Sequence, residues 1–191
     1  MNNLSSIDIN TNSWKYYQHS RFGDNVEDRI KLWDLEQYSS PEWTLLDTGA
    51  SNGKFTSLLG HLFKKCVAVE PFADPVTQPA NVTWIKKGFK DFYRKNIDQF
   101  DVIYSFAMTL QIEEHDLMTT DEITQSYNNL LKPNGIIIYE TQNLYKLSHR
   151  THALKMLKSF KNIFGKEFRT GQGRTRNNRS VHFWKKNKNN L

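Results

Sequence analysis

Residues 45–60, LLDTGASNGKFTSLLG, constrain the fold of this 191-residue chain more than any other stretch. An apolar run leads into Asp47 and then into two glycines four residues apart, Gly49 and Gly53. The apolar residues that follow recur with the period of a helix. This order predicts a buried strand, a tight turn and a helix. Because glycine lets the backbone come close to a ligand, the spacing of the glycines indicates which ligand the turn holds.

Two common glycine turns do not fit this spacing. A nucleoside-triphosphate loop needs two glycines separated by four residues, then a Lys and a hydroxyl residue. Here the glycines are separated by three residues, and Phe55 stands where the hydroxyl belongs. A dinucleotide turn needs G-x-G-x-x-G, and its second and third glycines would fall at Ser51 and Lys54. The template that remains is D-x-G-x-x-x-G, which the stretch satisfies.

The chain alternates segments with strand patterns and segments with helix patterns. We predict strands at 44–46, 66–69, 82–85, 100–106, 136–139, 166–170 and 181–184. We predict helices at 26–38, 54–63 and 148–164, a short helix near 88–95, and one that begins at a capping box at 119–122 and stops at 133–135. This order predicts an α/β fold, a Rossmann-like doubly wound seven-stranded sheet that is mostly parallel with an antiparallel C-terminal strand. In such sheets ligands lie at the carboxyl ends of the strands.

Composition indicates a cytoplasmic globular protein. The chain is 38% hydrophobic, enough for one domain with a sizeable core. No apolar run approaches the roughly 18 residues of a membrane span, and the polar N-terminus shows no signal peptide. The single cysteine, Cys66, fits a reducing compartment.

The glycine turn and three further segments resemble the class I S-adenosylmethionine-dependent methyltransferases. The segments are VAVEP at 67–71, FDVIYSF at 100–106 and LLKPNGIIIYE at 130–140, each on the expected element and in the expected order. The resemblance covers 44 to about 186. It implies a methyltransferase that uses S-adenosylmethionine, built as one domain over 1–191. Within it, 1–40 would form an N-terminal lid and helix, 44–186 the core and 187–191 a tail.

The resemblance also implies roles for individual residues at the cofactor. Asp47 would support the turn and approach the methionine amino group, while Gly49 and Gly53 would let the backbone approach the cofactor. Glu70 would accept both ribose hydroxyls, since a carboxylate presents two acceptor oxygens. Phe89 would lie against the adenine ring, with Asp91 as a weaker candidate for the adenine amino group. The remaining cofactor-binding candidates are Ala50, Ser105 and Arg21.

The acceptor side offers fewer clues. The segment 14–30, WKYYQHSRFGDNVEDRI, looks like the lid of methyltransferases that act on terminal phosphates, and this likeness implies roles for Tyr17 and Arg21. The aromatic residues there could equally pack onto the sheet. His115 is a candidate general base, because histidine accepts a proton at neutral pH, although a loop histidine facing water explains it as well. We expect no metal ion, because Gln111 stands where related RNA 3′-end enzymes place a carboxylate ligand.

Charge is concentrated near the end of the chain. Residues 146–188 hold thirteen Lys or Arg and one acid, a formal charge of +12 that leaves −6 for the rest. Arginines grip phosphate with paired hydrogen bonds, and Arg174, Arg176 and Arg179 are the best placed for a phosphate-bearing acceptor or for RNA. A solubilising basic tail is the alternative.

We therefore predict methyl transfer to an oxygen of a small sugar-type or phosphate-bearing acceptor. The segment after the fourth strand, SFAMTLQI, lacks the Pro-Pro-aromatic signature of amine-methylating nucleic-acid enzymes. One alternative is an RNA methyltransferase that acts on a phosphorylated or cap-type end. A second is a nucleic-acid-binding module that has kept the fold and lost catalysis. We predict no membrane partner.

Overall fold

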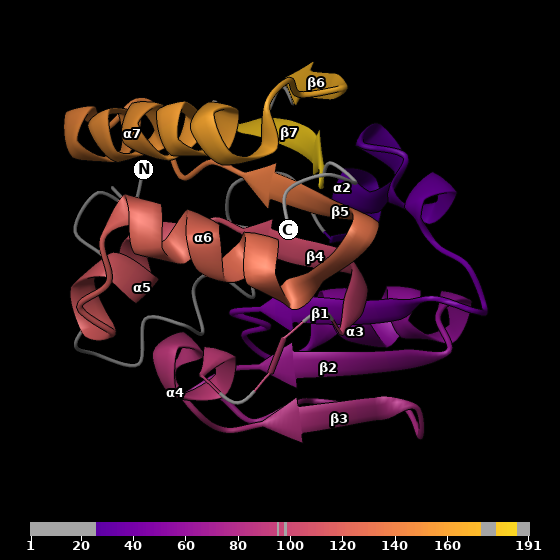
Figure 1. Cartoon of the computed structure of the whole chain (residues 1–191). Helices are drawn as coiled ribbons and strands as arrows, with labels where there is room; N and C mark the ends of the chain where they lie inside the picture. Colours follow the sequence, from indigo (N-terminus) through magenta and orange to yellow (C-terminus); the bar gives the residue numbers. More distant parts are fainter. Residues whose placement is uncertain (1–25, 95, 98, 173–178, 187–191) are drawn as a thin grey trace, which may run out of the picture.

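A computed structural model describes residues 26–94, 96–97, 99–172 and 179–186 (Figure 1). It holds one seven-stranded sheet in the order β3-β2-β1-β4-β5-β7-β6. The strands are β1 (Thr44–Thr48), β2 (Lys65–Val69), β3 (Val82–Ile85), β4 (Phe100–Phe106), β5 (Leu131–Glu140), β6 (Arg169–Gln172) and β7 (Ser180–Lys185). Strands β1 to β5 pair in parallel, whereas β7 is antiparallel to both β5 and β6. The predicted sheet is confirmed.

Helices precede, separate and follow these strands. They are α2 (Val26–Leu32), η2 (Leu35–Tyr38), α3 (Lys54–Leu59), η3 (Gly60–Leu62), α4 (Phe89–Tyr93), α5 (Thr109–His115), α6 (Thr120–Leu130) and α7 (Leu147–Phe164). The predicted capping box begins α6. The Thr119 hydroxyl accepts the Glu122 N–H at 3.2 Å, and the Glu122 carboxylate accepts the Thr119 N–H at 2.7 Å.

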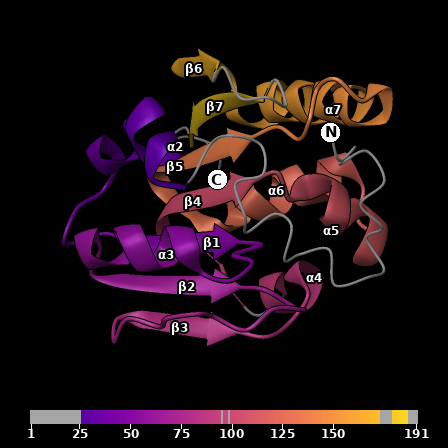
Figure 2. The same cartoon turned by 180° about the vertical axis from the view of Figure 1, so that it is seen from behind.

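The central strands β1, β2, β4 and β5 bury side chains on both faces of the sheet. Leu46 and Ile137 belong to a core beneath α4, α5, α6 and α7, while their neighbours Leu45 and Ile138 belong to a second core beneath α2 and α3. Figures 1 and 2 show the two helical layers on opposite sides. Successive residues of a strand point to opposite faces, so burying both requires helices on both sides. This double layer leaves the strand ends as the place where a ligand can reach the sheet.

Several element boundaries differ from the sequence prediction. The helix expected at 26–38 breaks at Asp34, whose φ of 50° ends α2 and separates it from η2. The helix expected to run to 133 ends at Leu130, because β5 starts at Leu131 and passes through Pro133. The sixth strand starts three residues later than predicted, at Arg169.

One helix was not predicted at all. Helix α5 covers Thr109–His115, a stretch expected to be a loop. It begins directly after β4, at a turn where Ala107 takes a φ of 55°. Its apolar residue Ile112 is buried in the core, which holds the helix against the sheet. His115 is therefore the last residue of a helix.

No helix in the described part of the chain combines the length and the apolar run that spanning a membrane requires.

Candidate active site

The turn after β1 has the backbone geometry that its glycines allow. Gly49 and Gly53 have φ of 72° and 77°, and Ser51 between them has φ of 55°. The Gly49 N–H donates to the Val69 carbonyl oxygen at 2.8 Å, which fastens the turn to the end of β2. A Cβ at Gly49 would lie 2.2 Å from Cγ of Met108. A side chain here would be strained by φ and blocked by Met108, so glycine is required.

Asp47 lies beneath this turn. Its side chain is buried in β1, and the Thr56 hydroxyl of α3 donates to Oδ2. Burial raises the pKa of the Asp47 carboxyl to about 6, the Thr56 hydrogen bond opposes the shift, and the charge of Glu70 adds to it. Asp47 is thus a buried carboxyl group with a pKa of about 6, and it lies near the carboxyl end of the central strand β1.

Glu70 follows β2 and is completely buried. Its Oε2 accepts the Ser51 N–H at 3.0 Å, and its Oε1 accepts the N–H groups of Phe72 at 2.9 Å and Ala73 at 3.3 Å. Burial raises the pKa of Glu70, and the three backbone donors oppose that shift. The carboxylate therefore ties the glycine turn to the loop after β2.

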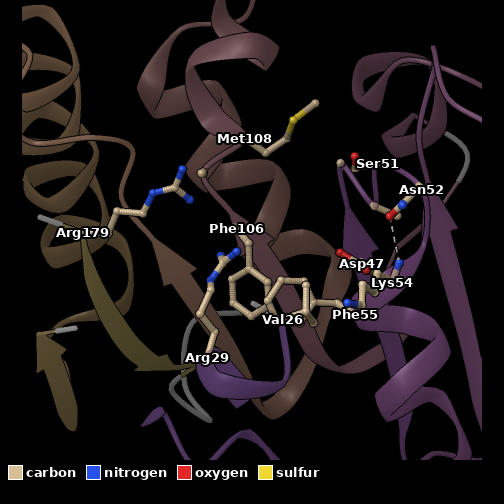
Figure 3. Close-up of a pocket in the computed structure, with 13 residues that line it drawn as sticks. Val26, Arg29, Asp47, Ser51, Asn52, Lys54, Phe55, Phe106, Met108 and Arg179 are labelled. Carbon is tan, nitrogen blue, oxygen red and sulfur yellow. Dashed lines mark hydrogen bonds between the residues drawn. The ribbon is translucent and has the colours of Figure 1, made fainter. Parts of the chain in front are cut away.

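A pocket of about 600 Å³, partly open to solvent, lies against the turn (Figure 3). The turn and Asp47 form one side of it, and Arg179 lies on the opposite side. Phe106 and Met108, at the end of β4 and just after it, lie between the two sides. Ala50 also lines this pocket. With Val26 and Arg29 of α2, which also line it, residues from four separate parts of the chain face one space.

Two arginines of this pocket hold one buried carboxylate. Glu140, the last residue of β5, is fully buried and accepts a hydrogen bond from Arg179 at 3.1 Å and another from Arg29. The guanidinium of Arg29 also lies over the rings of Trp33 and Phe55, at 5.1 and 4.8 Å from their centroids. The arrangement fixes two positive side chains at the pocket wall opposite the glycine turn.

A second, smaller pocket of about 300 Å³ adjoins the first and shares Gly49 and Met108 with it. Its wall includes Phe72, which is half exposed, and Asp116 after α5. His115 lines it too, with its ring centroid 5.4 Å from that of Phe72. Together the two pockets extend from Asp47 in the first to the aromatic side chains Phe72 and Phe89 in the second.

The predicted cofactor residues are distributed over these pockets unevenly. Phe89 lines the second pocket but is 4% exposed, with its ring packed 5.1 Å from that of Tyr127. Ser105 lines neither of these two pockets; its buried hydroxyl lies 2.8 Å from the Tyr127 hydroxyl. Asp91 is exposed on α4, away from both, and Asp116 faces the second pocket instead.

Four of the predicted residues lie outside the described part of the chain: Tyr17, Arg21, Arg174 and Arg176. Arg179, expected to hold phosphate, is described and lies in the first pocket.

Sequence reasoning missed Arg29, Glu140 and Met108. Glu140 had a usable indication, since an acid that ends a buried parallel strand lies at the ligand-binding edge. Arg29 and Met108 had none, because a single arginine on an amphipathic helix or a methionine after a strand is ordinary. Within the described ranges, no group of three or more His, Cys, Asp or Glu side chains is arranged to hold a metal ion.

Solved structures with this fold include several methyltransferases. The chain aligns with the N-methyltransferase NodS from Bradyrhizobium japonicum WM9, crystallised with S-adenosylhomocysteine, at a TM-score of 0.67 and 15% identity, covering 87% of this chain and 90% of NodS. It aligns with precorrin-6y C5,15-methyltransferase from Geobacter metallireducens GS-15 at a TM-score of 0.60 and 13% identity, covering 88% and 92%. The [4+2]-cyclase SpnF aligns at 0.62 and 12%, covering 84% and 82%. These likenesses show the fold.

Sequence comparison identifies the family. No curated protein sequence matches the chain. The sequence profile of a methyltransferase-domain family, however, matches residues 17–183, which is most of the chain. The chain therefore belongs to this family and is a class I S-adenosylmethionine-dependent methyltransferase.

Proposed function

We propose that the chain transfers a methyl group to an oxygen of a small acceptor that carries a phosphate or a similar anionic group. One observation carries the proposal: the first pocket joins the glycine turn to Arg29 and Arg179 (Figure 3). The turn would position the cofactor and the arginines the acceptor, facing each other across one space. The sugar-type character of the acceptor rests on the sequence resemblance alone.

The two adjoining pockets fit a ligand with an amino-acid end and a nucleoside end. Asp47 and the amides of the turn would hold the amino-acid end, while Phe72 and Phe89 would contact the adenine. Asp116 is better placed than Asp91 to accept from the adenine amino group, because it lines the second pocket. S-adenosylmethionine would supply a methyl group on a positively charged sulfur.

The acceptor side depends on arginines that are already fixed. Guanidinium groups bind phosphate with paired hydrogen bonds, and binding is stronger where the groups need not be reordered. Glu140 holds both arginines, and the Trp33 and Phe55 rings flank Arg29. Arg179 is 6% exposed, so it suits an acceptor that enters the pocket better than an RNA strand lying on the surface.

The chain's own contribution would be alignment and exclusion of water, which suffice for an in-line displacement. An ionised phosphate oxygen needs no base, whereas a hydroxyl must lose its proton. His115 stays a candidate base for the second case. It lines the second pocket, so the acceptor would have to reach the rim near Met108.

Transfer of labelled methyl to paired acceptors tests the proposal. Sugar phosphates and nucleotides should be methylated, and their dephosphorylated forms should react at least about tenfold less efficiently, as expected for loss of a charge-assisted contact. Arg179→Gln keeps hydrogen-bond donors near Glu140 and should raise KM for the phosphorylated acceptor without weakening S-adenosylhomocysteine binding. Arg94→Gln, at an exposed arginine after α4, is the control. Equal rates for both acceptor forms would refute the anionic-acceptor proposal.

A further inference from the structure

The outer face of α7 combines basic and large apolar side chains in water. We call this surface the α7 outer face; it consists of the exposed residues Leu147, Arg150, Thr151, Leu154, Lys155, Lys158 and Lys161. Leu147 is 68% exposed and Leu154 64% exposed. Tyr145, two residues before the helix, is 72% exposed. Three of the most exposed large apolar residues in the described part of the chain thus lie within ten residues of one another.

The α7 outer face carries only one sign of charge. Helix α7 contains four cationic residues on this face and no Asp or Glu anywhere in its length. Two carboxylates from other helices contact polar side chains of α7: Asp121 of α6 accepts the Ser159 hydroxyl at 2.7 Å, and Glu113 of α5 lies 2.7 Å from Nδ1 of His152. Lysines spread around exposed leucines form a surface that suits an anionic partner with an apolar interior.

This surface begins at the same edge of the sheet as the pocket. Glu140, which holds the two pocket arginines, is separated from Leu147 by six residues, and the first two of these, Thr141 and Gln142, are buried. Burial lowers the pKa of His149, in the first turn of α7, and the charges of Lys146 and Arg179 add to the shift. Figure 1 shows α7 as an outer layer that starts at the edge of the sheet to which the parallel strands point. Tyr145 and Leu147 therefore lie on the same edge as the acceptor pocket.

We propose that the α7 outer face docks on a membrane surface that contains anionic lipids, and thereby brings the pocket to a membrane-borne acceptor. This proposal replaces the sequence prediction of no membrane partner. Nucleic acid would bind the lysines through phosphate and could stack a base on Tyr145, but it offers exposed leucine side chains no apolar phase to enter. A bilayer rewards both, since the cations meet lipid headgroups and the apolar side chains enter the interface. The role of the acceptor rests on the proposed function; the docking does not.

Vesicle sedimentation of the full chain tests the docking. Wild type should sediment with phosphatidylcholine vesicles that contain phosphatidylglycerol and not with pure phosphatidylcholine. Lys155→Gln/Lys158→Gln/Lys161→Gln should weaken partitioning by roughly a hundredfold. Leu147→Gln/Leu154→Gln should weaken it by at least about tenfold, because the apolar contact is lost while every charge remains.

Matched controls come from other exposed positions. Lys31→Gln/Lys64→Gln/Lys65→Gln removes three exposed lysines elsewhere, and Ile97→Gln removes another exposed apolar side chain. Both should partition within about threefold of wild type.

Three results would overturn the docking: no binding to anionic vesicles, equal losses in the control variants, or a loss in the lysine variant with none in the leucine variant. A short RNA that binds through the same lysines while vesicles do not bind would assign the surface to nucleic acid instead. Calorimetry with S-adenosylhomocysteine separates the two proposals. Wild type that fails to bind this compound contradicts the proposed function, whereas partitioning alone decides the docking.

Discussion

Glu70 and Glu140 occupy equivalent places in the sheet but are neutralised in different ways. Each carboxylate lies at the carboxyl end of a parallel strand, and each is completely buried. Glu70 accepts three backbone N–H groups, from residues in the two loops beside it. Glu140 accepts from two arginine side chains, Arg29 of α2 and Arg179 directly before β7.

The difference separates a part of the site made of backbone from a part made of side chains. Backbone amides can hold a carboxylate whatever side chains surround them, so the cofactor end keeps its shape as long as the loops do. The acceptor end keeps its shape only while Arg29 and Arg179 both donate hydrogen bonds to Glu140. Burying a charge is costly unless it is paired, so each partner at that end depends on the others. Substitutions should therefore affect stability most at Glu140 and cofactor affinity most at the turn.

Removing the acid that holds both arginines should give the largest effect. Glu140→Ala leaves Arg179 and Arg29 beside a vacated acceptor position, and breaking a buried ion pair costs about 3–5 kcal/mol. Urea unfolding at neutral pH measures the loss. Asp74→Ala, which breaks the exposed pair with Lys86, should cost under about 1 kcal/mol. A similarly small loss for Glu140→Ala would show that water reaches the two arginines.

Substitution of Asp47 should give the next largest change in the free energy of unfolding, and it should stabilise the chain instead of destabilising it. Its pKa is raised to about 6 by burial, so between its ordinary value near 4 and 6 the folded chain holds a proton that the unfolded chain has lost. Stability therefore falls as pH rises through this window. Asp47→Asn should stabilise the chain by up to about 3 kcal/mol at pH 7, and by under about 1 kcal/mol near pH 4. Unfolding curves at several pH values check it; a gain that does not depend on pH would contradict the cause given.

Substitution in the glycine turn should lower the affinity for S-adenosylhomocysteine. Gly49→Ala adds a Cβ at a positive φ and in contact with Met108, so the turn must move. We expect S-adenosylhomocysteine affinity to fall at least about a hundredfold, the loss of one or two well-placed hydrogen bonds. Gly60→Ala is the matched control, because its φ is −57° and its nearest side-chain atom would lie 3.3 Å away. Calorimetry that gives equal affinities for the two variants would remove the turn from the cofactor site.

The same contrast explains which parts were predictable from sequence. The positions of the strands along the chain and the glycine turn depend on local patterns, because period and turn chemistry lie within a few residues. The acceptor end depends on contacts across 111 residues between Arg29 and Glu140 and across 39 between Arg179 and Glu140. No local pattern encodes such pairings. Helix α5 was missed for a related reason, since its short apolar pattern is anchored by the core and not by a cap.

Glu70 tests whether the backbone-held acid also touches the cofactor, and it should give the smallest of these effects. Glu70→Ala leaves the N–H groups of Ser51 and Phe72 without their carboxylate and removes the predicted acceptor for the ribose hydroxyls. Affinity for S-adenosylhomocysteine should fall at least about tenfold, since a hydrogen bond to a charged group is worth about 1.5–3 kcal/mol.

Glu70→Gln separates the two roles. Its amide oxygen can still accept backbone N–H groups, but its NH₂ group cannot accept at all. If Glu70 only ties the loops together, S-adenosylhomocysteine and its analogue without ribose hydroxyls should lose affinity equally in Glu70→Gln. If Glu70 binds the ribose, the variant should weaken the natural compound by at least about fivefold more than the analogue. A change below about threefold for Glu70→Ala would mean that the ribose is held elsewhere.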